Sequence, residues 1–114
     1  MSFISKKERI VNDWAIKIAY SQDLNVTEDF DNVSINIKAD GEFLTTVVDS
    51  LDSLHYQEGL WDIVNDNEEV RFLYTDPLQT PDRAFWKILR LKKDEMWVTT
   101  EMDSVLYEFH LITK

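Results

Sequence analysis

The sequence contains no cysteine and has only two glycines and two prolines among its 114 residues. Without cysteine the chain has no disulfide framework, no thiolate nucleophile and no cysteine-based metal site. Two widely separated glycines cannot form a glycine-rich loop around a phosphate group. These absences exclude several classes of enzyme and metalloprotein.

Long hydrophobic runs and an excess of basic residues are also missing. No apolar stretch approaches the roughly 18 residues of a membrane-spanning helix, so we expect no transmembrane segment. Residues 1–7 lack the hydrophobic region of a signal peptide, so we expect none within this chain. The formal charge is −10, from 22 acidic and 12 basic residues. Because such a field repels phosphate backbones, we expect no nucleic-acid partner.

The residues that are present suffice for one hydrophobic core. Hydrophobic residues make up 44% of the chain and aromatic residues 12%. A chain of this length fits one domain, and no linker or repeat divides it. We therefore predict a single domain over residues 1–114.

The N-terminal segment has a capping box. Ser5 can accept a hydrogen bond from the backbone of Glu8, and the Glu8 side chain can reach back. This pattern predicts a short helix over about residues 6–12. From Trp14 the spacing of apolar residues changes to two, which predicts a strand. This alternation places Trp14, Ile16, Ile18 and Tyr20 on the side of the strand that faces the core.

Seven further segments have the composition or alternation of β-strands. They are 33–38, 42–48, 56–64, 69–74, 83–91, 95–101 and 105–113. Asp40-Gly41 is a strong hairpin turn signal. Gly59 indicates a bulge or a close backbone approach, and Pro77 and Pro81 should lie outside central strands.

Together these segments predict an all-β protein with one short N-terminal helix. Its strands, from 14 to 113, would form an up-and-down antiparallel β-barrel of about eight strands. A flattened sandwich is the main alternative. A barrel of eight strands is either filled by side chains or holds one small ligand.

The order of these signals resembles a known family. The pattern consists of a tryptophan after a short helix, an Asp-Gly hairpin, Gly59-Leu60-Trp61, the segment from Trp86 to Leu91, Lys93 to Trp97, and a last strand with Glu108. It resembles the small lipocalin-like domains of exported Bacteroidetes lipoproteins over residues 10–114. In one departure, Asn12-Asp13-Trp14 stands where lipocalins proper have Gly-x-Trp.

The resemblance implies a lipocalin/calycin-like barrel with Trp14 plugging one end. It also implies a cell-envelope or secreted location, with a cytoplasmic one left open. It assigns no catalytic residue, and the residues themselves suggest none. The chain has only two histidines, His55 and His110, and lacks a Gly-x-Ser-x-Gly motif. The acidic residues around 62–69 lack calcium-loop spacing. We expect no enzyme activity, no metal and no cofactor.

Aromatic residues on separate strands are the strongest candidates for a binding site, because inward positions of a barrel converge. The candidate cavity residues are Phe43, Trp61, Phe72, Trp86, Trp97 and Tyr107. The competing interpretation is that they only fill the core. Thr45-Thr46 and Thr99-Thr100 are adjacent pairs, so one residue of each must face inward, which favours a partial cavity.

We therefore expect a non-enzymatic module that binds a small hydrophobic ligand in the barrel. The alternative is a cell-envelope interaction or structural protein whose packed barrel binds a protein partner through loops or an acidic surface. The oligomeric state is open. The segment 83–91 is apolar on both faces, with Phe85 and Leu89 opposite Trp86 and Ile88. Either the N-terminal helix, which we favour, or another protein would cover its outer face.

Overall fold

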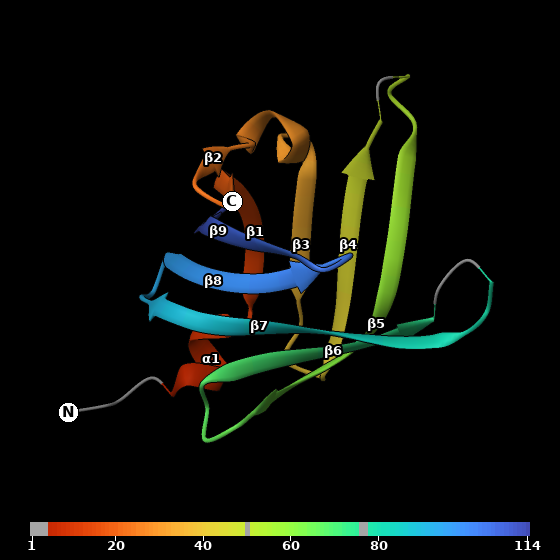
Figure 1. Ribbon diagram of the computed structural model, residues 1–114. Helices are drawn as coiled ribbons and strands as arrows, with labels where there is room; N and C mark the ends of the chain where they lie inside the picture. Colours follow the sequence, from red (N-terminus) through yellow and green to blue (C-terminus); the bar gives the residue numbers. More distant parts are fainter. Residues whose placement is uncertain (1–4, 50, 76–77) are drawn as a thin grey trace.

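The computed structural model describes residues 5–49, 51–75 and 78–114. Their elements, in chain order, are α1 (Lys6–Ile10), β1 (Asn12–Ser21), β2 (Leu24–Asn25), the 3-10 helix η1 (Thr27–Phe30), β3 (Val33–Ile37), β4 (Glu42–Val48), β5 (Leu54–Val64), β6 (Glu69–Thr75), β7 (Pro81–Leu91), β8 (Glu95–Met102) and β9 (Val105–Thr113). The predicted strands are all present (Figure 1).

Eight of these strands close into an antiparallel barrel. Each pairs with the next along the chain, from β1 and β3 through to β9, and β9 pairs back with β1. The two-residue β2 adds a short extra strand beside β1. The predicted up-and-down barrel is confirmed, and closure of the sheet rules out the flattened sandwich.

The up-and-down order gives the barrel two distinct ends. The β3–β4, β5–β6 and β7–β8 turns lie at the end that carries α1, which we call the α1 end. The segment from β1 to β3 and the β4–β5, β6–β7 and β8–β9 connections lie at the other, open end. In Figure 1 the helix is at the lower left, whereas the β4–β5 and β6–β7 hairpins project at the top and right.

The helix is shorter than predicted. Ser5 caps α1 as expected, since its Oγ accepts a hydrogen bond from the Glu8 amide at 3.2 Å. The helix ends at Ile10 rather than Asn12, because Val11 is extended, with φ −67° and ψ 101°. Asn12 then already pairs with Ile37 in the sheet. Sheet pairing thus replaces the last predicted turn of helix.

The predicted alternation of the first strand is wrong after Ile16. A β-bulge interrupts the pairing there: Ile16 is opposite Leu111, but Ile18 is opposite the adjacent His110, so Lys17 is an extra residue. The bulge shifts the inward face by one position. Ala19 is therefore fully buried, whereas Ile18 and Tyr20, predicted to face inward with Trp14, are only half-buried.

Both glycines occupy positions that other residues fit poorly. Gly41 has φ +91° in the turn between β3 and β4, as the Asp-Gly signal predicted. Gly59 lies where the backbones approach closely: a Cβ atom there would be 2.1 Å from the carbonyl oxygen of Leu73. Of the two open possibilities for Gly59, close approach is correct. The prediction that both prolines lie outside central strands is wrong for Pro81, which is the first residue of β7 and lies opposite Thr75; the first position of a strand tolerates proline. Pro77 lies outside the described residues.

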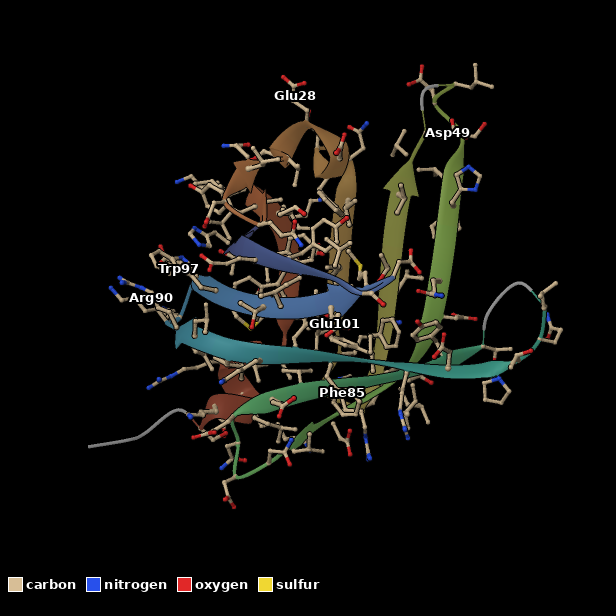
Figure 2. The ribbon with its side chains drawn as sticks, in the orientation of Figure 1. Glu28, Asp49, Phe85, Arg90, Trp97 and Glu101 are labelled. Atoms are coloured by element: carbon tan, nitrogen blue, oxygen red, sulfur yellow. The ribbon has the colours of Figure 1, made fainter. Side chains whose placement is uncertain are left out.

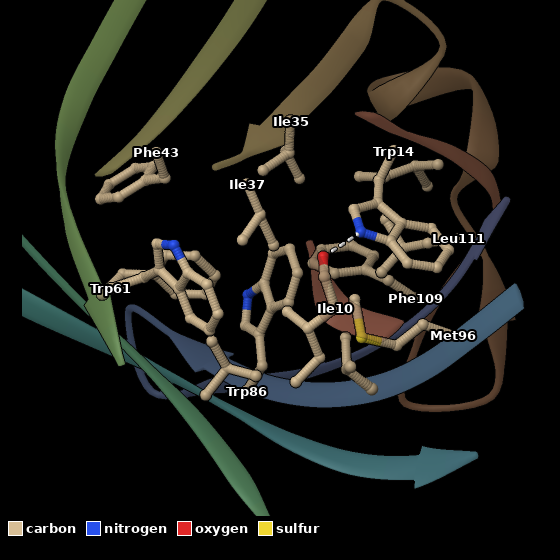
Figure 3. Packing of buried hydrophobic residues seen from close by; sticks show 14 of the residues in the cluster. Ile10, Trp14, Ile35, Ile37, Phe43, Trp61, Trp86, Met96, Phe109 and Leu111 are labelled. Carbon is tan, nitrogen blue, oxygen red and sulfur yellow. Dashed lines mark hydrogen bonds between the residues drawn. The ribbon is translucent and has the colours of Figure 1, made fainter. Parts of the chain in front are cut away.

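The α1 end holds the densest part of the core. Trp14 is fully buried, and its indole nitrogen donates a 2.8 Å hydrogen bond to the carbonyl oxygen of Ile10 (Figure 3). Trp14 thus plugs the α1 end of the barrel, as the resemblance implied. The other largest fully buried side chains are Ile10, Ile37, Met96, Leu111, Val70 and Val98. Most lie within a few residues of the strand termini at this end.

The outer face of β7 is not covered by the helix. Phe85 and Leu89 do lie opposite Trp86 and Ile88, but they remain 37% and 48% exposed. The expectation that α1 covers them is wrong because the helix instead places Ile10 in the barrel core. Figure 2 shows Phe85 on the outside of the sheet.

Candidate functional site

A cavity of about 530 Å³ occupies the open half of the barrel. Its walls come from β1 and from β3 to β9, together with η1. At its mouth the lining residues are exposed, and deeper inside they belong to the hydrophobic core. The barrel is therefore packed at the α1 end and hollow at the open end.

An aromatic wall lines one side of the cavity. Phe43 and Phe72 meet edge to face, with ring centroids 4.9 Å apart, and Phe72 meets Trp86 in the same way at 4.6 Å. Phe30 and Phe109 form a second such pair at 4.9 Å across the cavity lining. These interlocked rings hold one another in place. The wall is thus a pre-formed apolar surface.

Two threonine hydroxyls interrupt the apolar lining. Thr45 and Thr100 both face the cavity, so each threonine pair in the sequence does place one member inward. Thr100 is only 5% exposed. Among the hydrogen bonds of the described residues, none involves its hydroxyl. The hydroxyl is accessible, although the side chain as a whole is buried, so it is available to bind a polar group of a ligand in the cavity.

The mouth of the cavity is mainly acidic. Asp82, Glu101 and Asp103 border it, and all three are exposed. Arg83 is the one basic residue that the described lining contains. Asp82 accepts a 2.8 Å hydrogen bond from the Arg83 backbone amide. The three carboxylates therefore outnumber the single guanidinium at the entrance.

The six residues predicted from sequence divide between four locations. Phe43, Phe72 and Trp86 come together in the cavity wall. Trp61 is buried at the α1 end, where its indole nitrogen donates to the Lys38 carbonyl oxygen at 2.8 Å. Figure 3 shows it beside the packed core.

The remaining two predicted residues lie away from the cavity lining. Trp97 is on the outer face, where it stacks on His110 at 4.0 Å and packs beneath the Arg90 guanidinium at 5.0 Å (Figure 2). It faces outward because Met96 and Val98 on either side are buried. Tyr107 contacts Phe30 edge to face at 5.8 Å and borders a smaller hollow of about 310 Å³.

Several cavity residues were not singled out from sequence. Phe30 lies in the polar and acidic stretch 21–32, which has the composition of a loop, but η1 places its ring against Phe109. Ile16 and Ile35 line the cavity as well. Their alternation predicted an inward face but not how far along the barrel each residue lies. Phe30 could have been identified as a buried residue from the sequence, since it is a lone aromatic residue in an otherwise acidic stretch.

The two histidines lie outside the cavity lining. His55 Nε2 is 2.7 Å from Asp49 Oδ2 on the β4–β5 hairpin, and His110 Nε2 is 2.6 Å from Glu108 Oε2 on the outer face. The hydrogen bonds from His55 and from the Ser53 and Leu51 amides lower the pKa of Asp49. Neither pair is placed to act on a molecule in the barrel.

The described ranges contain no group of three or more histidine, aspartate or glutamate residues arranged to hold a metal ion. Within those same ranges, no helix is long and apolar enough to cross a membrane.

Comparison with known proteins identifies the fold. The chain is similar to a lipocalin-like protein from Bacteroides uniformis, with a TM-score of 0.69 and 13% identity over 93% of this chain and 99% of that one. It is also similar to an uncharacterized protein from Bacteroides eggerthii, with a TM-score of 0.58 and 12% identity over 88% and 97%. No family model and no curated protein matches the sequence. The fold is therefore a lipocalin-like barrel.

Proposed function

We propose that this protein is a non-enzymatic binding module that takes one small hydrophobic ligand into the open half of its barrel. The observation that carries the proposal is the cavity of about 530 Å³. This volume is within the usual range for small-molecule sites, roughly 300–1,000 Å³. Phe43, Phe72 and Trp86 supply the apolar wall.

The packed α1 end supports the same proposal. Because Ile10, Trp14 and Met96 close that end without exposure, a ligand can enter only from the open end. The cavity floor is formed by core residues such as Phe43, Phe72 and Trp86, so the packed core also fixes the shape of the site. The rival interpretation, a packed barrel that acts through a protein partner, requires no hollow half. A cell-envelope location stays a prediction.

Adjacent residues of β4 provide a matched test. Thr45 lines the cavity, and Thr46 points to the other side of the sheet, opposite Tyr56. The probe is N-phenyl-1-naphthylamine, an uncharged dye that brightens in apolar surroundings. We expect saturable binding at micromolar concentration. Thr45→Phe should weaken it by about tenfold by filling the space, and Thr46→Phe should change it less than about twofold.

Far-UV circular dichroism checks that both variants keep the β-fold. If the dye does not bind the wild-type protein, or if both substitutions weaken its binding equally, the proposal is contradicted. In that case the rival, a protein partner bound through loops or the acidic surface, becomes the function to pursue.

A further inference from the structure

We propose that the ligand of this cavity is a hydrophobic amine, whose apolar body fills the barrel and whose ammonium group lies at the mouth. The inference rests on the proposed function, because it specifies what the same cavity takes. Its three supports are the sign of the charge at the open end, the free hydroxyl of Thr100, and the aromatic wall.

Charges are distributed unevenly between the two ends. The open end and its connections carry Asp23, Glu28, Asp29, Asp31, Asp49, Asp52, Asp82, Glu101 and Asp103. The α1 end also carries acidic residues, but most of the basic residues of the chain lie there and offset much of their charge. The acidic ones are Glu8, Asp13, Asp40, Glu42, Asp62, Asp66, Glu68, Glu69, Asp94 and Glu95, and the basic ones are Lys6, Lys7, Arg9, Lys38, Arg90, Lys92, Lys93 and Lys114. In Figure 2 Glu28 and Asp49 lie at the top, far from Arg90. A cation approaching the mouth is therefore attracted and an anion repelled.

Arg83 does not reverse this preference. It is exposed and lies opposite Leu73, whose side chain also faces outward. The next residue, Ala84, turns back to the cavity, as does Asp82 on the other side. Glu101 occupies a similar outward position, since it follows buried Thr100 and lies opposite exposed Leu106. The rim as a whole carries three carboxylates and one guanidinium, so its charge is negative. An anionic ligand such as a fatty acid would have to enter against this field.

Thr100 provides a directional contact for the amine. It comes immediately before Glu101 and close to the β8–β9 turn, so it lies on the mouth side of the cavity. Thr100 itself is only 5% exposed. Its hydroxyl has no partner among the described residues and is accessible, so it can accept a hydrogen bond from an ammonium N–H. A primary ammonium supplies such a donor, whereas a quaternary one does not.

The aromatic wall suits the apolar body of such a ligand. The rings of Phe43, Phe72 and Trp86 are buried deep in the cavity, where they form a pre-formed apolar surface. Wall and mouth therefore bind different parts of the ligand. An apolar body with a primary amine satisfies all three features.

Three decyl compounds that differ only in the head group test the inference. Decylammonium, decan-1-ol and decanoate are titrated below micelle formation, with tryptophan fluorescence as the readout because Trp86 lines the cavity. At low salt we expect decylammonium to bind about tenfold tighter than decanoate, with decan-1-ol between them. This ratio should shrink at 0.5 M salt, since salt screens the exposed carboxylates.

Two double variants with the same change in net charge provide the control. Glu101→Gln with Asp103→Asn neutralises the mouth, and asparagine suits position 103, where φ is +53°. Glu68→Gln with Asp94→Asn neutralises two carboxylates at the α1 end. The first should weaken decylammonium about fivefold and leave decan-1-ol unchanged. The second should leave both affinities unchanged.

A third variant tests the contact between the ammonium group and Thr100. Thr100→Val keeps the shape of the side chain and removes the hydroxyl. We expect wild-type protein to bind decylammonium tighter than decyltrimethylammonium, and Thr100→Val to abolish that difference.

The outcomes separate this inference from the proposed function. If decan-1-ol and decanoate bind as tightly as decylammonium, the cavity binds ligands but the preference for amines is refuted. Equal loss of decylammonium binding in both double variants refutes it too. If none of the three compounds binds, the proposed function itself fails.

Discussion

At the scale of single residues, the two glycines are required for different physical reasons. Gly59 has no room for a side chain, since a Cβ atom would be 2.1 Å from the Leu73 carbonyl oxygen and 2.9 Å from the Phe43 ring. Gly41 has room, because a Cβ atom there would be 4.0 Å from the Trp61 carbonyl oxygen, but its φ of +91° suits few side chains. Steric contact governs one position and backbone conformation the other.

This difference makes a prediction for substitutions at both positions. Gly59→Ala should lower the free energy of unfolding by about 3 kcal/mol, because the obstructing atom belongs to the backbone. Gly41→Ala should cost about 1 kcal/mol, and Gly41→Asn less than that, since asparagine tolerates positive φ. Urea unfolding of the three variants measures this. A Gly59→Ala protein as stable as wild type would contradict the close approach.

At the scale of elements, the β4–β5 hairpin is held by one side chain. Asp49 Oδ1 accepts hydrogen bonds from the Leu51 amide at 2.9 Å and the Ser53 amide at 3.0 Å, while Oδ2 contacts His55. Because these contacts favour the charged carboxylate, they lower the pKa of Asp49 below 3.8. Asp49 therefore stabilises the hairpin above pH 3.8, and this contribution is lost as the pH falls through its folded pKa.

The titration of Asp49 tests this account of the hairpin. The amide chemical shifts of Leu51 and Ser53, followed by NMR, should titrate with a midpoint below pH 3.8. His55→Ala should move that midpoint upward, because the hydrogen bond from His55 is the largest cause of the shift. His110→Ala, on the outer face of β9, serves as the control and should leave the midpoint unchanged. A midpoint at or above 3.8 would show that the contacts do not form in solution.

At the scale of the whole molecule, the acidic open end opposes folding at low salt. The net charge is −10, and carboxylates such as Glu101 and Asp103 have few basic neighbours there. We expect the free energy of unfolding to rise by about 1 kcal/mol between 10 and 200 mM NaCl, as salt screens this repulsion. Urea unfolding at both salt concentrations measures the change.

The two double variants localise that salt effect. Neutralising Glu101 and Asp103 should reduce the gain in stability with salt, because it removes charges from the repulsive end. Neutralising Glu68 and Asp94 should reduce it less, because basic residues at that end offset part of the repulsion there. Lys6 contacts the Asn67 carbonyl oxygen beside Glu68, and Lys92 and Lys93 precede Asp94. Stability that is independent of salt in the wild type would refute the argument.

The sequence by itself determined the architecture, since the relevant signals are local. Alternation along each strand, the Asp40-Gly41 turn and the Ser5 cap each depend on a few neighbouring residues, and all predicted strands formed. Consecutive antiparallel strands without long crossovers then leave few ways to close a sheet. The adjacent threonines also predicted one inward member of each pair, which Thr45 and Thr100 confirm.

Only the tertiary structure decided where the cavity lies and which aromatic residues surround it. Alternation divides a strand into two faces, but burial by other strands determines which face is inside, so Trp97 lies outside next to buried Met96. The bulge at Lys17 reverses the faces within one strand, and the local pattern does not reveal it. Depth along the barrel depends on the register of neighbouring strands and on which turn a side chain meets. The Trp61 indole donates to the Lys38 carbonyl oxygen at the α1 end, whereas Trp86 lines the cavity.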